Sequence, residues 1–280
     1  MRARTLAREL LPPVLVRALR AARGAAPPDA AMPVGRTYPS WADAVAASAG
    51  YGTQDILQRV EAATQRVLAG EAAFERDSVA FARMELPFPL LAGLLRAAAE
   101  RPDAAAPLRV LDFGGSLGST YRQCRGFLPV LPRLHWAVVE QEHVVQAGRA
   151  RYTTDELTFH RSIDDAAASH PPHVAIAASS LQYLPEPQAA FAALARTGAR
   201  YILVDRTPLA DAADDRVIVQ QVPPSIYPAS YPCWILSRTR LLRALGDGWE
   251  VLADYACANA PLRTDRGDAT LHGWILRRAL

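Results

Sequence analysis

The sequence has no lysine, few cysteines and no long apolar run. All 31 basic residues are arginine, which together with abundant alanine indicates a GC-rich genome. Cys124, Cys233 and Cys257 form no CxxC pair and no metal-ligand spacing, so neither a disulfide framework nor a zinc site is predicted. No stretch of about 18 apolar residues occurs, which excludes a predicted membrane-spanning helix. The expected location is therefore the reducing cytoplasm.

A net positive charge is lacking outside the N-terminus. The net charge is +3, but residues 1–25 hold six arginines against Glu9 and carry +5, which leaves −2 for the other 255 residues. Nucleic-acid binders concentrate positive charge on the folded body, so no nucleic-acid partner is predicted. Apolar residues and arginines are interspersed in residues 1–25. This segment is therefore interpreted either as a peripheral membrane contact, as a frayed leader, or as a helix packed on the body.

Composition changes divide the chain into three parts. Residues 1–39 are a basic leader and a linker rich in proline and alanine, residues 40–104 are a helical block, and residues 105–280 are the main domain. Within the block, apolar spacing predicts three helices. The first begins near Asp55 and ends before Gly70, the second covers residues 72–84, and the third covers residues 88–100. The charged run at residues 75–77 is interpreted as a solvated turn, with a pocket rim as the alternative.

From residue 108 short apolar runs alternate with helical patterns. This pattern predicts a parallel sheet with helices on both faces. The predicted strands are 109–113, 136–140, 157–160, 174–179 and 201–205, followed by an antiparallel pair at 249–256 and 270–277. The predicted helices are 119–127, 142–151, 187–197 and 237–245. The expected fold class is α/β, a Rossmann-like fold with a mostly parallel seven-stranded sheet and a terminal antiparallel pair.

The clearest local motif is VLDFGGSLG at residues 110–118, between a strand and a helix. Glycines at such a turn let the backbone approach a ligand closely. The spacing differs from G-x-G-x-x-G, and no Gly-Lys-Ser/Thr follows as in a P-loop. Asp112 would repel a diphosphate and attract an ammonium group, so a cationic nucleoside cofactor is favoured. The candidate cofactor residues here are Asp112, Gly114, Gly115, Ser116 and Gly118.

Glu140 ends the second predicted strand, with Gln141 directly after it. A carboxylate at this position accepts hydrogen bonds from both hydroxyls of a ribose. Each acid also has a purely structural interpretation, Asp112 as a turn residue and Glu140 as a helix-start charge. Together, at neighbouring strand ends, they predict S-adenosylmethionine as the cofactor, with Gln141 among its contacts.

Weaker candidates follow the next strands. Asp164 is either an adenine contact or a helix N-cap. Ser179 and Ser180 would run beside the methionine part of the cofactor. Tyr183 either lines a methyl-transfer channel or packs on a helix.

Asp205 and Arg206 end the fifth predicted strand, where an acceptor would approach. Asp205 is a candidate base, and Arg206 is a candidate anchor for an anionic group. The alternative is a buried Asp–Arg pair that shapes the loop. The histidines form no cluster at metal-ligand spacing, so no metal is predicted.

The segment from Val222 to Trp234 holds four prolines and three aromatic residues. The prolines predict a stiff loop. Tyr227, Tyr231 and Trp234 are candidate substrate-binding residues that form an apolar or sugar-stacking wall. The alternative is that they are core residues beneath a loop that covers the sheet edge.

Several strings resemble a family of class I S-adenosylmethionine-dependent methyltransferases found in bacteria, often encoded near surface-polysaccharide genes. The resemblance runs from about residue 40 to the C-terminus. Its strings lie at 40–51, 74–81, 110–121, 136–145, 179–187, 204–208 and 222–237. The resemblance implies cofactor roles for Asp112, Gly114, Gly115, Gly118 and Glu140. Ser116 stands where many such enzymes have glycine.

The residues and the resemblance together predict a methyltransferase that acts on a small-molecule or glycan-linked acceptor, at oxygen. A cofactor-binding scaffold or regulator without turnover is the first alternative, because no catalytic base is obvious. A nicotinamide-dependent oxidoreductase is the second, and the glycine spacing argues against it. The oligomeric state is not predicted.

Overall fold

The structure is a computed structural model. It describes residues 35–49, 53–101, 103–129, 131, 133–221, 229–258 and 261–279, with no side-chain description at 53–55. Residues Met1–Val34 are a separate unit, and Gly35–Leu280 form the body. The predicted membrane contact of residues 1–25 and the substrate contact of Tyr227 therefore lie outside the described residues. The helix expected to begin near Asp55 begins at Thr53.

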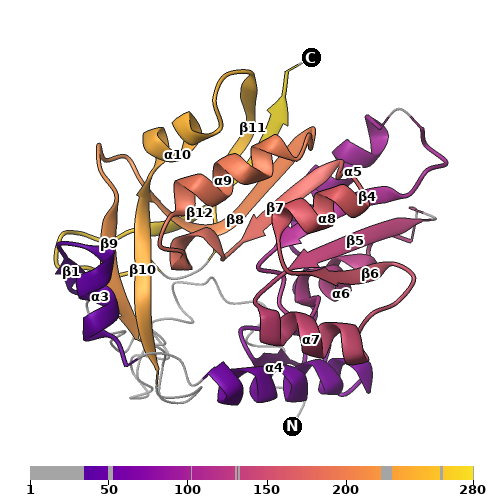
Figure 1. Cartoon of the computed structure of the whole chain (residues 1–280), viewed down its shortest axis with the longest axis horizontal. Helices are drawn as coiled ribbons and strands as arrows, with labels where there is room; N and C mark the ends of the chain where they lie inside the picture. The colour runs from indigo at the N-terminus through magenta and orange to yellow at the C-terminus, as the bar shows by residue number, and fades with distance from the viewer. Residues whose placement is uncertain are drawn as a thin grey trace, which may run out of the picture. The chain divides into compact units, whose positions relative to one another are not determined.

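The predicted seven-stranded sheet is present in the body. The strands lie in the order β6-β5-β4-β7-β8-β12-β11; the first five are parallel, and β12 is antiparallel to both of its neighbours, β8 and β11 (Figure 1). Their bounds are Leu157–His160, Leu134–Val139, Leu108–Phe113, Val174–Ala178, Tyr201–Ala210, Thr270–Arg278 and Trp249–Ala256. β7 is buried along its whole length, as expected of a central parallel strand with helices on both faces. The predicted fold class is confirmed.

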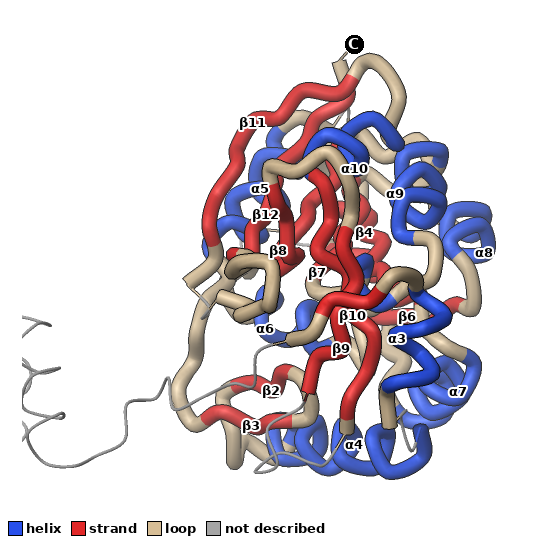
Figure 2. The backbone as a smooth tube through the Cα atoms, turned by 90° about the vertical axis from the view of Figure 1, so that its left-hand side faces the viewer, coloured by secondary structure: helices blue, strands red, loops and turns tan. Residues whose placement is uncertain are grey.

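Two apolar cores cover the two faces of this sheet. Helices α5, α6 and α7 contribute to one core and α8, α9 and α10 to the other, and Figure 2 shows α5 and α6 across the strands from α8 and α9. These helices span Phe88–Ala99, Ser119–Arg125, Glu142–Arg151, Ile163–Ser169, Pro187–Arg196 and Arg238–Ala244. The remaining helices are α3 (Trp41–Ala47), α4 (Thr53–Leu68) and the 3-10 turn η1 (Leu181–Tyr183). None of the helices in the described ranges combines the length and apolarity needed to cross a membrane.

The sheet is larger than predicted, because three strands extend it beyond β8. β10 (Ser230–Ser237) pairs with the end of β8 and with β9 (Arg216–Gln221), and β9 pairs with β1 (Thr37–Tyr38). The prediction of a loop up to Trp234 is wrong from Ser230 onward. Pro232 pairs with Val219 of β9, but only residues 236–237 of β10 pair with β8, so β10 has a described partner on one side only at Pro232, and proline is tolerated at such an edge position.

The predicted helix at 72–84 is wrong. β2 (Phe74–Arg76) and β3 (Val79–Phe81) form a two-residue hairpin whose turn residues, Asp77 and Ser78, have φ of 52° and 67°. Two left-handed turn residues match the right-handed twist of the flanking strands. Phe74 and Phe81 stack at 4.6 Å between ring centroids. The block before the sheet therefore contains a hairpin as well as helices.

Candidate functional site

Three side-chain-bearing residues adopt left-handed backbone at one edge of the sheet. Ser116 follows β4 with φ of 54°, Ser179 follows β7 with φ of 56°, and Arg206 has φ of 46° just past the pairing of β8 with β7. Such conformations cost about 1–3 kcal/mol each and cluster at functional sites. Since β4, β7 and β8 are adjacent and parallel, the three residues lie at the same edge. This edge is the candidate site.

The turn after β4 closes over the carboxylate of Asp112. A Cβ atom at Gly115 would lie 2.6 Å from Oδ2 of Asp112, so only glycine fits there. The indole N–H of Trp136 donates to the same oxygen at 3.0 Å, and Asp112 is fully buried. Gly118, with φ of 91°, is the N-cap of α6. The glycine positions are therefore explained by close approach and by positive φ.

The buried Asp112 carboxylate has an unsatisfied oxygen. Oδ1 has no hydrogen-bond partner among the residues that the structure describes. Burial raises the pKa of this carboxyl to about 7; the Trp136 N–H lowers it, and the charge of Glu140 raises it further. An unpaired buried carboxylate is costly, and a nearby cation would stabilise its ionised form.

Glu140 joins the ends of β4 and β5. Its Oε1 accepts from the backbone N–H of Ser116 at 3.2 Å, and its Oε2 accepts from that of Gln141 at 2.9 Å. Burial raises the pKa of Glu140, and these two N–H groups oppose the shift. Each oxygen keeps a lone pair, so the carboxylate is able to accept from two adjacent hydroxyls. The structure thus brings Asp112, Ser116, Gln141 and Glu140 together.

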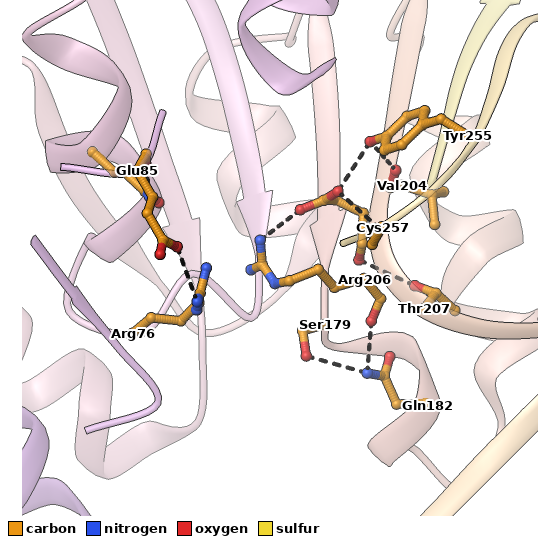
Figure 3. A network of polar contacts seen from close by, with 11 residues as sticks. Arg76, Glu85, Ser179, Gln182, Val204, Arg206, Thr207, Tyr255 and Cys257 are labelled. Carbon is orange, nitrogen blue, oxygen red and sulfur yellow. Dashed lines mark hydrogen bonds and ion pairs between the residues drawn. The ribbon is translucent and has the colours of Figure 1, made fainter. Parts of the chain in front are cut away.

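The loop after β7 lies against the glycine turn. A Cβ atom at Gly114 would lie 2.6 Å from the Cβ of Ser180, whose Oγ is buried without a partner. The side-chain amide of Gln182 donates to Ser179 Oγ and to the carbonyl of Arg206, both at 3.2 Å (Figure 3). Gln182 therefore fixes the ends of β7 and β8 relative to each other.

Both oxygens of the Asp205 carboxylate accept hydrogen bonds. Oδ1 receives the hydroxyl of Tyr255 at 3.0 Å and the thiol of Cys257 at 3.6 Å, and Oδ2 pairs with Arg206 at 2.5 Å (Figure 3). A Cβ at Gly273 would lie 2.2 Å from the Tyr255 ring, so this glycine makes room for the tyrosine. The buried Asp–Arg pair considered from the sequence is present, and the role of Asp205 as a base stays a prediction.

Removal of the Tyr255 hydroxyl tests the strength of this network. We expect Tyr255→Phe to lower the free energy of unfolding by about 1–2 kcal/mol, because the hydroxyl donates within reach of both Asp205 Oδ1 and the Val204 carbonyl. Urea denaturation measures the change. An unchanged unfolding midpoint with an unchanged slope would show that water replaces the hydroxyl at no cost.

The aromatic candidates divide into two pairs. Tyr183 meets Tyr231 edge to face at 5.1 Å between centroids, and its hydroxyl donates to Oε1 of Gln220 at 3.2 Å. Trp234 stacks on Trp41 at 5.6 Å and donates its indole N–H to the Leu184 carbonyl at 3.0 Å. Tyr183 and Tyr231 are therefore brought together, whereas Trp234 has the packing contacts of a core residue.

Asp164 lies apart from these contacts. Ser162 is the N-cap of α8, because its Oγ accepts from the backbone N–H of Asp165 at 3.0 Å. Asp164 is exposed in the first turn of this helix. The N-cap alternative for Asp164 is therefore wrong, and its adenine contact stays a prediction.

Sequence reasoning gave no cofactor-binding or catalytic role to three polar residues at this edge, of which Glu75 and Gln182 are buried and Tyr255 is half-buried. Tyr255 and Gln182 fix β8 by the bonds described above, and Glu75 is buried against α6. The interpretation of residues 75–77 as a solvated turn is wrong for Glu75 and holds for the exposed Asp77. The sequence signal that reveals Glu75 is the pair of phenylalanines symmetric about Asp77–Ser78, which indicates a hairpin.

Comparisons with known proteins give structural likenesses only. No protein-family model and no curated protein matches the sequence. The N-terminal domain of EvdMO1, in the presence of SAH and D-fucose, is 15% identical, with 82% of this chain and 98% of that chain covered and a TM-score of 0.46. CalS10, an amino pentose methyltransferase from Micromonospora echinaspora with bound SAM, is 14% identical over 69% and 90%, with a TM-score of 0.45. An S-adenosylmethionine-dependent methyltransferase from Clostridium acetobutylicum ATCC 824 is 8% identical over 69% and 92%, with a TM-score of 0.42. Because these likenesses are so low, the function has to be inferred from the residues of the candidate site.

Proposed function

We propose that this protein is an S-adenosylmethionine-dependent methyltransferase. The observation that carries the proposal is the position of two carboxylates, the buried Asp112 and the half-buried Glu140, on either side of a glycine turn at adjacent strand ends. Carboxylates at this turn favour a cation and a ribose and disfavour the diphosphate of a nicotinamide dinucleotide. Asp112 Oδ1 and Ser180 Oγ have no hydrogen-bond partner in the described part of the chain; the cofactor would satisfy Ser180, and would act on the fully buried Asp112 through its charge or through water.

Each residue of the site has a defined task in this proposal. Glu140 holds the ribose hydroxyls, and its bond to Ser116 keeps the glycine turn in place. Asp112 supports the cofactor's positive charge from beneath the turn, and Ser179 and Ser180 line its methionine side. The cofactor supplies a methyl group activated on a sulfonium. The chain provides alignment and exclusion of water, which are the main requirements of an in-line displacement.

Direct titration tests the proposal. Isothermal titration calorimetry of the full chain with S-adenosylhomocysteine should show saturable binding, and a fluorescence titration with NADH should show none. A folded sample that does not bind S-adenosylhomocysteine would rule the proposal out. Binding of NADH in its place would favour the oxidoreductase alternative.

The affinity for S-adenosylhomocysteine should increase as the pH rises from about 6 to 8. Asp112 has a raised pKa of about 7 in the ligand-free protein. The protonated carboxyl therefore stabilises the ligand-free protein at low pH, and this stabilisation is lost as the pH rises through 7. A cation favours ionised Asp112, so binding releases protons around neutral pH. Asp112→Asn keeps an acceptor for Trp136 and should show a shallower pH dependence by calorimetry. An identical slope in this variant would contradict the assignment.

The acceptor would approach from the ends of β7 and β8. Arg206 is the proposed anchor for an anionic or polar acceptor group, and its pairing with Asp205 holds the guanidinium in place. Tyr183 and Tyr231 supply a joined aromatic surface of the kind that stacks on small molecules or sugars. A small-molecule or glycan-linked hydroxyl acceptor fits this combination, with Asp205 as the proposed base.

A cofactor-binding scaffold without turnover is the second candidate. It is favoured by one observation: both Asp205 oxygens already accept hydrogen bonds, so proton removal competes with Tyr255, Cys257 and Arg206. Transfer of a labelled methyl group from S-adenosylmethionine to a panel of sugars and hydroxylated small molecules separates the two candidates. A cytoplasmic location and peripheral membrane contact through residues 1–25 remain proposals from the sequence.

A further inference from the structure

Glu75 is a buried carboxylate beside the end of the glycine turn, where α6 begins. It lies on β2, is 4% exposed, and accepts a hydrogen bond from the hydroxyl of Ser119, the residue that follows Gly118. β2 packs directly on α6. The hairpin thus places a third acidic side chain beside the turn that covers Asp112.

Glu75 forms no ion pair among the described residues, and the charge of Arg122 reaches it only through space. The guanidinium of Arg122 donates to the Leu117 carbonyl at 2.5 Å and lies over the Tyr152 ring. Arg76, its neighbour in sequence, pairs with Glu85 and lies over the Phe74 ring. Burial raises the pKa of Glu75 to about 7; the Ser119 hydroxyl and the charge of Arg122 oppose the shift, and the charge of Asp77 adds to it. The ionised form of such a buried carboxylate is stabilised when a cation binds next to it.

A second observation at the turn also points to a ligand. Within the described ranges, Oδ1 of the fully buried Asp112 has no partner beneath the turn, and Oγ of Ser180 has none on the other side of the turn. Asp112 has no exposed surface, so it acts on a ligand through its field or through water. Glu75 supplies the carboxylate that reaches the turn from the hairpin side.

We propose that Glu75 is a cofactor-binding residue whose carboxylate receives the amino-acid ammonium group of S-adenosylmethionine. The inference rests on the proposed function and adds to it a cofactor contact from outside the sheet. The ammonium group has three N–H donors and therefore bonds to Glu75 while the field of Asp112 stabilises its charge. The competing explanation is that Glu75 only caps the start of α6 through Ser119.

A cycle of two variants and two ligands tests this contact. Glu75→Gln keeps an acceptor for Ser119 and removes the charge, and Asp77→Asn removes an exposed carboxylate two residues away in a left-handed turn that asparagine tolerates. The ligands are S-adenosylhomocysteine, which has the ammonium group, and 5′-methylthioadenosine, which lacks it. Calorimetry at pH 7.5 should show Glu75→Gln binding S-adenosylhomocysteine about 10- to 100-fold more weakly. Its affinity for 5′-methylthioadenosine should change less than about twofold, which corresponds to a few tenths of a kcal/mol in the free energy of binding.

The control and the number of released protons complete the test. Asp77→Asn should bind both ligands like wild type. Wild type should release more protons than Glu75→Gln on binding S-adenosylhomocysteine, measured in two buffers of different ionisation enthalpy. Equal weakening for both ligands, or no weakening at all, would assign Glu75 to the fold alone and overturn the inference. Absence of S-adenosylhomocysteine binding by wild type would instead overturn the proposed function.

Discussion

Glu140→Ala should lower the affinity for S-adenosylhomocysteine by at least about 100-fold. The carboxylate is placed to accept from two ribose hydroxyls, and hydrogen bonds to a charged group contribute about 1.5–3 kcal/mol each. The alanine variant also leaves the N–H groups of Ser116 and Gln141 without their acceptor. A loss of about 3–5 kcal/mol corresponds to two to three and a half orders of magnitude in Kd. Calorimetry measures the change directly.

Glu142→Ala is the matched control for this experiment. Glu142 lies two residues later, in the first turn of α7, and its ion pair with Arg161 at 2.6 Å is half-exposed on both sides. Exposed pairs contribute little, about 0–1 kcal/mol. We expect the control to bind within about twofold of wild type, which is less than 0.5 kcal/mol. Equal losses in the two variants would show that charge near α7, and not the Glu140 carboxylate, governs binding.

The cofactor side of the site was predictable because it depends on strand ends. Once β4 and β5 are recognised from their apolar runs, parallel pairing brings Asp112 and Glu140 to one edge whatever the details of the loops. The helix of residues 142–151 and the strands of residues 157–160 and 249–256 were predicted at their observed bounds. Long periodic segments and strand-end positions carry this information locally.

Contacts between distant segments were not predictable in the same way. Tyr255 reaches Asp205 because β11 pairs with β12 and because Gly273 leaves space, and neither condition is visible in the residues around Tyr255. The hairpin of residues 74–81 was missed because its apolar positions fit a helical period as well as a strand period. β10 was missed because its proline is tolerated only where the neighbouring strand has already ended.

Gly115→Ala is the substitution with the largest expected effect on the turn itself. Its Cβ would lie 2.6 Å from Asp112 Oδ2, and Asp112 cannot retreat because it is fully buried and bonded to Trp136. Overpacking of this kind costs about 1–3 kcal/mol. We expect a loss of this size in urea denaturation and a loss of S-adenosylhomocysteine affinity of about 30-fold or more, or about 2 kcal/mol. Displacement of the turn would move Ser116 away from Glu140.

A control and a double variant show whether the clash itself is the cause. Gly126 caps the same helix at its other end with φ of −63° and has open space where a Cβ would lie, so Gly126→Ala should leave affinity unchanged and stability equal or slightly higher. Asp112→Ala removes the two atoms that the Cβ of Gly115→Ala would approach most closely, Oδ2 at 2.6 Å and Cγ at 2.7 Å, and leaves the Cβ of residue 112 at 3.2 Å. If the clash is the cause, the double variant Asp112→Ala/Gly115→Ala should be no less stable than Asp112→Ala alone, a non-additivity that only neighbouring residues show. Strictly additive losses would place the effect of Gly115→Ala elsewhere in the turn.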